Sequence, residues 1–451
     1  MTNLFDKFNK ISKEEWTKQI EKDLKGKSLD LMNIYDNIEE LSYSTYYSSE
    51  DISSKNVQPG NYPYLRGINS TDNDWSNCFF IEVTDESTAN KKALSVLMKG
   101  CDSIYLKSKK SQIDWATVLN GIEHEFINLH FELNNFDDFE IINSIINKHN
   151  RRHSFNFDFI EQPNDQQFET LANSLKKHQQ RVFKINGFGA QQIGANTWQE
   201  IGFCLNAGHE ILLKLMEKGL SIDEAAACLN FQIGIGANYF LEIAKIRSFR
   251  TLWAKVVDAY SPNLSSSYNL KIIAISGHLN KSVVDPHTNL LRQTTEAMAA
   301  VSAGIDDLLI LPHDQYSSKG VSELAERMAL NISSILKEES YFDKVIDPLG
   351  GSYSIEELSK IIGEKAWTFF QELESKEGLF SNDCLTYFKS KILAKRDQRI
   401  ELFESKKITG IGINKYQSSE FKNEANWTSL PLYLDVPFFN YEVSTLIGNN
   451  K

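Results

Sequence analysis

Two short glycine-containing segments are the first places where this sequence could do chemistry. Gly187-Phe188-Gly189 and Gly234-Ile235-Gly236 both begin like a dinucleotide-binding fingerprint, but neither has the final glycine at the required distance. A strand that ends in glycine at the rim of a barrel explains them better, because the following turn needs a positive φ or a close approach to a ligand. The sequence contains no Walker-type glycine loop, Gly-x-Ser-x-Gly elbow or His-Glu-x-x-His helix.

The nine histidines do not cluster as metal ligands do. His149 and His153 have the i, i+4 spacing that could present two rings to one metal, but the two arginines between them oppose a cation, and we interpret this segment as a solvated helix end. His124 and His130 are the other close pair. His313-Asp314 follows the last predicted strand, where a barrel enzyme places catalytic groups. We weigh an acid–base pair there against a capping aspartate beside a surface histidine, and favour the second.

Composition excludes several classes of protein. A chain of 451 residues with 41% hydrophobic and 24% charged residues is typical of a soluble globular protein. The net charge of −12 argues against a nucleic-acid partner, and the run from Lys107 to Lys110 is broken by a serine and indicates a solvated surface. No apolar stretch approaches the roughly 18–20 residues of a membrane-spanning helix. The N-terminus has no signal pattern, so we expect a cytoplasmic protein without a membrane partner.

The cysteines do not predict a zinc site or a redox dithiol. They are far apart and odd in number, which is typical of reduced thiols that serve as small apolar fillers. The five are Cys78, Cys101, Cys204, Cys228 and Cys384. The reactivity of Cys78 and Cys204 stays open at this point.

The chain alternates from about residue 78 between short β-rich runs and longer helical segments. The predicted strands are Cys78–Val83, Asp102–Leu106, Phe126–Leu133, Phe155–Ile160, Arg181–Asn186, Leu229–Gly236, Leu270–Gly277 and Asp306–Pro312. Alternation of this kind requires right-handed crossovers and a parallel sheet, and eight units within roughly 250 residues close a barrel. The sequence therefore predicts an α/β fold, a (β/α)8 TIM barrel.

An amphipathic helix is predicted before this pattern begins. Ser12 and Glu15 have capping-box spacing, Trp16 and Ile20 follow at helical intervals, and Gly26 closes the segment. Its single apolar stripe must be buried on its own core or on another chain. We therefore expect an N-terminal helical arm.

Three further segments follow from local pattern. Tyr239–Val257 is predicted to be an outer barrel helix with one apolar face, made by Phe240, Ile243, Phe249, Leu252, Trp253 and Val256. Lys245, Arg247, Arg250 and Lys255 are expected on its solvent side. Glu323–Ser340 is another amphipathic helix, and the turn-rich segment 347–353 precedes the helix that contains Trp367. The last forty residues lose regular spacing, and residues 430–439 are too aromatic for a free linker and too broken by proline for a helix. We expect an irregular tail along the chain's own surface or a partner's.

Several segments together resemble the barrel of the adenosylcobalamin-dependent acyl-CoA mutases, specifically the methylmalonyl-CoA mutase family. They are Phe231–Arg247, Arg250–Lys255, Thr288–Ala300, Lys337–Tyr353 and Ile408–Tyr416. The resemblance covers about residues 59–416, so we divide the chain into an arm over 1–58 that contacts a partner, a mutase-type barrel with its following helices over 59–416, and a tail over 417–451.

The resemblance fails at the positions that carry chemistry in this family. Catalytic members have Ser-Gly-Tyr-His where this chain has Asn186-Gly187-Phe188-Gly189, so the phenol that meets the substrate and the imidazole that holds its thioester carbonyl are both missing. Asn69 stands where a substrate-wedging tyrosine is expected, in a shortened loop. Gly304-Ile305-Asp306 replaces a His-Thr-Gln that addresses the CoA ester.

The motif that binds cobalamin in this family also has no full match in this sequence. The family's cobalt ligand is the histidine of Asp-x-His-x-x-Gly in a separate C-terminal domain, whereas the near match Asp285-Pro-His287 lies inside the barrel and lacks the glycine. We interpret His287 as a loop residue. The resemblance thus implies no catalytic residue, cofactor site or metal site in this chain and argues against acyl-CoA binding.

The resemblance implies a non-catalytic small subunit that pairs with a large catalytic mutase subunit. That large subunit would bind adenosylcobalamin and interconvert methylmalonyl-CoA and succinyl-CoA. Losing one donor to a developing oxyanion typically costs ~10²–10³-fold, so several losses together predict inactivity of this chain alone. Two alternatives stay open: a catalytic barrel that works with a separate small cobalamin-binding subunit, and a barrel reused as a binding module or regulator of the mutase.

Overall fold

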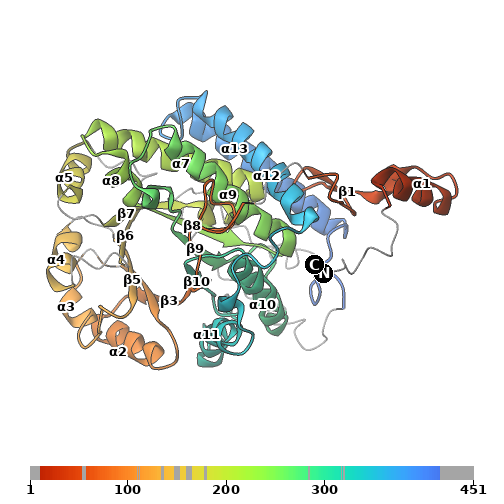
Figure 1. Ribbon diagram of the computed structural model, residues 1–451. Helices are drawn as coiled ribbons and strands as arrows, with labels where there is room; N and C mark the ends of the chain where they lie inside the picture. The colour runs from red at the N-terminus through yellow and green to blue at the C-terminus, as the bar shows by residue number, and fades with distance from the viewer. Residues whose placement is uncertain are drawn as a thin grey trace, which may run out of the picture.

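Eight parallel strands close into a barrel, as predicted (Figure 1). The computed structural model describes residues 11–52, 57–108, 110, 112–133, 137–146, 153–158, 165–176, 180–282, 285–315, 317 and 320–416. The strands are β3 (Ser76–Val83), β4 (Ser103–Ser108), β5 (Asn128–Glu132), β6 (Ser154–Asp158), β7 (Arg181–Asn186), β8 (Leu229–Ile235), β9 (Ile272–Ser276) and β10 (Asp307–Leu309). Each pairs with its neighbour in chain order, and β10 closes the ring on β3. All eight expected strands are confirmed; the tail predicted over 417–451 lies outside the described residues.

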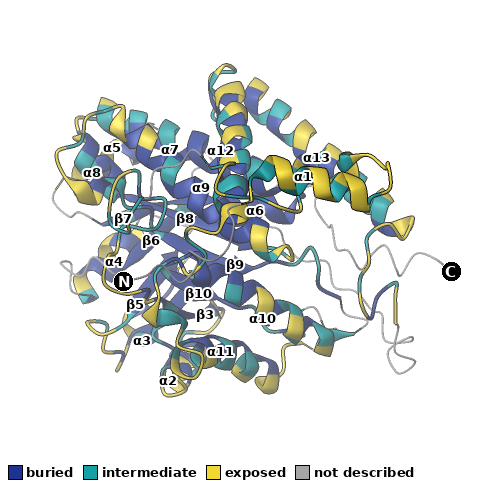
Figure 2. Cartoon of the chain, turned by 45° about the vertical axis from the view of Figure 1, so that its right-hand side comes forward, coloured by how far each residue is buried: buried dark blue, intermediate teal, exposed yellow. Residues whose placement is uncertain are grey.

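The strands are buried on both sides because helices cover the outside of the barrel and side chains fill its interior. Every residue of β5 and β8 is buried, which is typical of strands in a parallel sheet. The covering helices are α2 (Glu86–Leu97), α3 (Trp115–Val118), α4 (Asp137–Ile145), α5 (Asp165–Leu175), α7 (Thr197–Glu217), α8 (Ile222–Ala227), α9 (Tyr239–Asp258), α10 (Pro286–Ser302) and α11 (Glu323–Glu338). Figure 2 shows the resulting buried centre.

The helix α9 departs from its predicted orientation. Phe240, expected on the buried face, is 54% exposed, whereas Lys245, Arg247 and Arg250, expected on the solvent side, are 7% exposed or less. The reason is that α9 contacts α7, α10 and α12 (Tyr353–Glu374) as well as the barrel, so that it has almost no solvent side. Only the prediction for Lys255 is confirmed among the four basic residues.

The buried basic residues of α9 are held by carboxylates from other elements. Arg247 pairs with Asp347 and with Glu356, the second at 2.6 Å, and so joins α9 to the turn before α12 and to its first turn. A buried charge is tolerated only when it is paired and hydrogen-bonded in this way. The turn-rich segment predicted over 347–353 is therefore an ion-pair anchor for the barrel wall.

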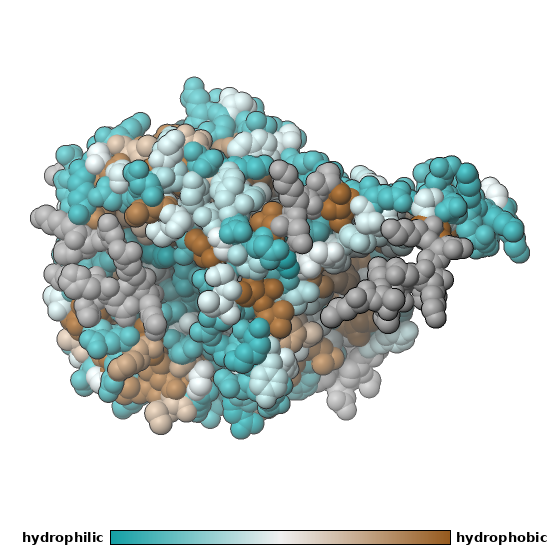
Figure 3. Space-filling model, viewed as in Figure 1, coloured by the Kyte–Doolittle hydropathy of each residue, from teal (hydrophilic) through white to brown (hydrophobic). Residues whose placement is uncertain are grey.

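The N-terminal arm projects from the barrel (Figures 1 and 3). Helix α1 (Lys13–Asp23) begins with the predicted capping box of Ser12 and Glu15, and none of its residues is buried. Trp16 of this helix stacks on Tyr46, with ring centroids 3.8 Å apart. The 3-10 helix η1 (Leu29–Met32) then leads to an antiparallel hairpin that the sequence did not predict, β1 (Asn33–Asp36) and β2 (Leu41–Ser44).

The hairpin and the last helices attach to the barrel beside α7. Glu39, in the hairpin turn, accepts hydrogen bonds from the backbone and the hydroxyl of Thr197 at 2.9 and 2.6 Å. Helix α13 (Asn382–Glu404) follows α12, and its Lys395 pairs with Glu40 of the same turn. These contacts place the hairpin beside α7 and α13. No helix among the described residues is long and apolar enough to span a membrane.

Candidate functional site

The segment Asn186–Gly189 lies at the carboxyl end of the barrel, where a barrel enzyme would carry its catalytic groups. Strand β7 ends at Asn186 and the short helix α6 (Gly187–Gln192) begins at the next residue. The Asn186 side chain caps this helix by accepting a hydrogen bond from the Gly189 backbone at 2.8 Å. A Cβ at position 187 would lie 2.5 Å from Cys204 Sγ, so Gly187 is required by a close approach and not by a positive φ.

Phe188 stands at the position where the resemblance predicts a phenol in catalytic chains. It is 2% exposed and belongs to a cluster inside the barrel that includes Tyr105, Ile273 and Leu309. The His278 ring meets it edge to face, with centroids 5.5 Å apart. A phenylalanine here can neither donate a hydrogen bond nor exchange a proton, so the position contributes packing.

Gly189 leaves no room for a side chain unless its neighbours move. A Cβ built at this position would lie 2.9 to 3.2 Å from three side-chain atoms of Asn186, closer than real Cβ contacts permit without movement. The cap that Asn186 makes on α6 therefore depends on the absence of a side chain at Gly189. Any side chain at position 189 requires the Asn186 cap to shift.

The other altered family positions lie at the opposite end of the barrel. Asn69, Gly304 and Asp306 line one hollow of about 50 Å³ next to the amino ends of β9 and β10. Asp306 accepts a hydrogen bond from the Ile272 backbone at 2.7 Å, and the Gly304 carbonyl accepts one from Arg250. The structure thus brings these three together and separates them from Phe188 and Gly189. Their altered role toward a CoA ester stays a prediction.

A buried charged cluster inside the barrel was missed by the sequence interpretation. Glu132 of β5 pairs with Lys107 at 2.8 Å and with Lys184 at 3.3 Å, and it accepts a hydrogen bond from the Tyr105 hydroxyl at 2.6 Å. Gln232 donates to the same hydroxyl at 2.8 Å. Lys107 is therefore no part of a solvated surface run, contrary to the prediction. The sequence does contain a signal for this cluster, because polar residues stand at alternate positions of β4, β5, β7 and β8. Side chains at alternate positions of a strand point to the same side, here the barrel interior.

The charge of Glu132 is fixed by its neighbours. Burial alone would raise the pKa of Glu132, but the ammonium groups of Lys184 and Lys107 outweigh it and lower that pKa to about 2. The carboxylate is consequently ionised at all physiological pH values. A group held so firmly in one state serves to bind and orient, and not to exchange protons near neutrality.

A second polar layer lies deeper in the barrel. His130 contacts Ser154 Oγ through Nδ1 at 2.6 Å and Asp307 through Nε2 at 3.1 Å. Asp307 also accepts from Ser103 at 2.7 Å and pairs with Lys271 at 2.7 Å. Burial opposes its ionisation, yet Lys271 and His130 hold the pKa of Asp307 well below its ordinary value. The order Ser–His–Asp resembles a hydrolase triad, but the three side chains are at most 1% exposed, so this layer is structural.

The remaining histidine predictions are partly wrong. His153 is buried just before β6 and accepts a hydrogen bond from the Leu129 backbone at 3.2 Å, so it is not at a solvated helix end, while His149 lies outside the described residues. His313 is 5% exposed and is no surface residue; burial lowers its pKa. His287 belongs to the first turn of α10 and stands 5.6 Å from the His313 ring, so it is not in a loop.

Neither Asp314 nor the cysteines provide a reactive centre. Asp314 accepts a hydrogen bond at 3.1 Å from the backbone of Ser322, the residue that caps α11, in agreement with a structural role. All five cysteines are buried and unpaired, as predicted. Burial raises the pKa of both Cys78 and Cys204 well above the ordinary thiol value, which disfavours the reactive thiolate. The described residues contain no group of His, Cys, Asp and Glu that could hold a metal.

Comparison with known proteins relates this chain to the methylmalonyl-CoA mutases. A family model described as methylmalonyl-CoA mutase matches residues 155–431. The methylmalonyl-CoA mutase small subunit of Porphyromonas gingivalis is 32% identical over 92% of this chain and 71% of its own length. The methylmalonyl-CoA mutase of Cereibacter sphaeroides is 25% identical over 90% of this chain and 64% of its own. The methylmalonyl-CoA mutase small subunit of Streptomyces virginiae is 35% identical over 44% of this chain and 32% of its own.

Proposed function

This chain belongs to the methylmalonyl-CoA mutase family, and we propose that it is the non-catalytic small subunit of a heterodimeric, adenosylcobalamin-dependent methylmalonyl-CoA mutase. The large subunit would carry the isomerase activity that interconverts methylmalonyl-CoA and succinyl-CoA. The observation that carries this proposal is the arrangement at Asn186–Gly189, where a phenylalanine and a capped glycine occupy the positions of the catalytic phenol and imidazole.

The chemistry of the reaction supports an inactive barrel. A rearrangement through radicals needs a dry site with fixed donors on the thioester oxygen, and removing one such donor typically costs ~10²–10³-fold. At the carboxyl end of this barrel Phe188 offers no donor, and Gly189 has no side chain to supply one. The losses multiply, so this chain alone should not turn over substrate.

The described residues do not fit the cobalamin that this family uses. Asp285, in the one near match to the cobalt-binding pattern, accepts from the backbone and hydroxyl of Thr288 at 3.3 and 2.5 Å as the cap of α10. His287, two residues later, is held in the first turn of that helix. Both residues are used within the helix, and we therefore assign the cofactor to the proposed partner.

The N-terminal arm supports a structural role. The apolar residues Trp16 and Ile20 lie on a helix with no buried residue, and such a stripe is stable only when another surface covers it. A partner that binds only the folded state stabilises it by mass action. The large subunit would therefore gain stability from this chain without any shared chemistry, within the cytoplasm.

One observation favours the rival function, a catalytic barrel served by a separate small cobalamin-binding subunit. The Glu132–Lys184–Lys107 cluster keeps ionised groups near the carboxyl end of the barrel, where a substrate could meet them. The rival must then explain how Phe188 and Gly189 support a thioester rearrangement. A regulator that binds the mutase loosely is the third candidate, and it predicts a dissociable complex.

Gentle affinity purification of the tagged full-length chain tests the proposal directly. We expect a stoichiometric partner larger than this chain, with an intact Tyr-His segment and a cobalamin-binding domain, and mutase activity only in fractions that contain it. A small cobalamin-binding protein as sole partner, or turnover by this chain without a second barrel, would contradict the proposal.

A further inference from the structure

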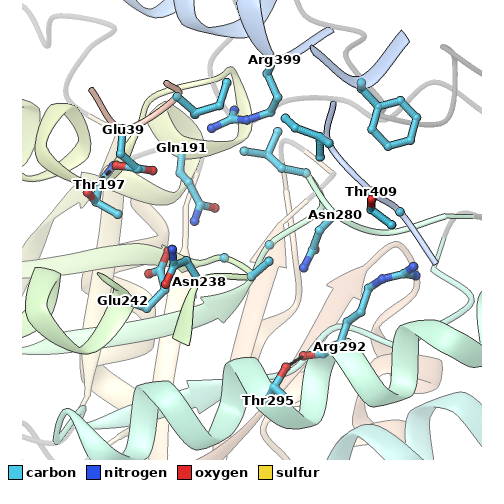
Figure 4. Close-up of a pocket in the computed structure, with 18 of the residues that line it drawn as sticks. Glu39, Gln191, Thr197, Asn238, Glu242, Asn280, Arg292, Thr295, Arg399 and Thr409 are labelled. Atoms are coloured by element: carbon cyan, nitrogen blue, oxygen red, sulfur yellow. Dashed lines mark hydrogen bonds between the residues drawn. The ribbon is translucent and has the colours of Figure 1, made fainter. Parts of the chain in front are cut away.

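A second cavity of about 610 Å³ lies outside the barrel interior, and we call it the rim cleft (Figure 4). Its floor is formed at the carboxyl ends of β8 and β9 by Gly236 and Gly277. The hairpin turn around Glu39 forms one side, and the segment from Arg399 to Ile413 forms another. Three parts of the chain that are far apart in sequence therefore meet around this cleft. Its size is within the range of roughly 300–1,000 Å³ that holds small-molecule ligands.

One wall of the rim cleft is apolar. Leu279 and Leu291 come from the β9–α10 region, and Phe403, Ile408 and Ile413 come from the end of α13 and the segment after it. Leu291 is 71% exposed although it faces this wall. Phe403 and Ile413 are buried in one cluster, whereas Leu291 leaves apolar surface exposed. This exposed apolar surface favours a ligand with an apolar part.

On the acidic side of the cleft, two carboxylate oxygens can accept hydrogen bonds from a ligand. Glu39 uses Oε2 for both hydrogen bonds from Thr197, and no described residue donates a hydrogen bond to its Oε1. Glu242 uses Oε2 to pair with Lys245 at 2.5 Å. Its Oε1 faces Gly236, where an added Cβ would come within 2.9 Å of it, so the glycine keeps this oxygen accessible from the cleft.

Donors face the same cleft. Gln191 is 5% exposed and accepts from Gln192 through Oε1 at 2.6 Å, but no described residue accepts a hydrogen bond from its Nε2. Figure 4 shows Gln191 and Arg399 pointing into the cavity from the top. Arg399 makes one long hydrogen bond, 3.4 Å to the Gly194 carbonyl, and no ion pair with any described carboxylate. Gln191 Nε2 is therefore a donor on the cleft wall that a ligand can use.

Arg292, on the far side of the cleft, already donates hydrogen bonds within the protein. It donates to Asn289 Oδ1 at 2.8 Å and to the Ile411 carbonyl, and so fastens the segment after α13 to α10. The cationic group left for a ligand is therefore Arg399. The cleft thus has groups of opposite charge at one end and an apolar wall at the other. A ligand that fits it must match both ends.

We propose that the rim cleft binds a small zwitterion with an apolar side chain, a ligand of the apolar α-amino acid class. Its carboxylate meets Arg399 and Gln191 Nε2, its ammonium group meets Glu39 and Glu242, and its side chain lies on the wall formed by Leu279, Leu291 and Phe403. Glu242 keeps Lys245 as its cation, so a ligand with one charge loses the contacts that the groups of the other sign would add, and binds more weakly. This binding site is independent of the proposed subunit function.

Isothermal titration calorimetry on the full-length chain tests this with L-leucine and two analogues that each lack one charge. 4-Methylpentanoate lacks the ammonium group and 3-methylbutylamine lacks the carboxylate. We expect leucine to bind and each analogue to bind at least ~10-fold more weakly, because a charge-assisted hydrogen bond is lost. Absence of binding by leucine, or equal binding by either analogue, would overturn the proposal.

Two variants and a control separate binding from folding. Arg399→Gln should weaken leucine binding by ~10-fold or more, whereas Arg327→Gln, on the exposed side of α11, should leave it unchanged. Leu291→Trp places a large ring on the apolar wall from an exposed position and should abolish binding without unfolding the chain. Unchanged binding in both cleft variants, with native circular dichroism, would place the ligand elsewhere and refute the site. The assay measures no mutase activity, so its failure leaves the subunit proposal unaffected.

Discussion

Replacement of Glu132 by glutamine is the most direct test of how the barrel interior is stabilised. Its carboxylate pairs with Lys107 and Lys184, and the Lys184 side chain is only 1% exposed. A carboxyl group whose pKa falls from 4.5 to about 2 on folding contributes about 3 kcal/mol of stability at neutral pH. Removing one partner of a buried pair costs about 3–5 kcal/mol in general. We therefore expect Glu132→Gln to lower the free energy of unfolding by about 3 kcal/mol at pH 7.

The pH dependence fixes the sign of the effect. The folded-state pKa is depressed, so the contribution of Glu132 is fully present above about pH 5 and is lost as the pH falls toward 2. Urea unfolding, followed by circular dichroism at pH 7, 5, 4 and 3, should show the difference between wild type and Glu132→Gln shrink as the pH falls. Glu125→Gln, at an exposed loop position, is the matched control and should change stability by less than about 0.5 kcal/mol. A loss below about 1 kcal/mol at pH 7, or a difference that is constant from pH 5 to 3, would refute the reasoning.

Three further changes test other parts of the fold. Gly189→Ala should lower the free energy of unfolding by about 1–3 kcal/mol, measured with urea, because its Cβ meets the Asn186 cap. Adding Asn186→Ser to the same chain should recover part of that loss. If the effects of the two substitutions are simply additive, the coupling between these positions is contradicted. Lys245→Met should cost about 3–5 kcal/mol, since it leaves two buried carboxylates without their cation, whereas Lys255→Met on the exposed side of α9 should be near neutral in the same assay. Ile20→Ala on the arm should leave the thermal midpoint of the isolated chain unchanged but reduce partner recovery in affinity purification; equal recovery would exclude the arm from the interface.

The elements that were predicted correctly depend on local pattern. The eight strands are short apolar runs between helical segments, and the start of α1 follows from the capping box of Ser12 and Glu15. The hairpin β1–β2 was missed because it has only four residues in each strand and no buried face that alternates clearly. Residues within one turn or one strand determine such elements, so the sequence carries enough information for them.

The orientation of α9 shows where local pattern fails. A helical stripe predicts one buried face only when the other face meets water, and α7, α10 and α12 remove the water from nearly all of α9. Lys245, Arg247 and Arg250 are accommodated because Glu200, Asp347 and the Gly304 carbonyl reach them from other elements. Burial and the nearby Glu242 raise the pKa of Glu200 to about 7 even though Lys245 opposes this, which reflects how completely the group is removed from solvent.

The sequence by itself determined the barrel, the arm and the identity of the altered residues at Phe188 and Gly189, because these depend on residue type and near neighbours. Only the tertiary structure decided that Asn186 closes the space at position 189, that Glu132 is held between two lysines, and that Glu39, Gln191 and Arg399 face one cleft. Strand register, and the position of the hairpin turn and of residues 399–413 at one rim, bring these groups together from segments that are far apart in sequence. Such contacts depend on the closure of the whole barrel, and no local pattern encodes them.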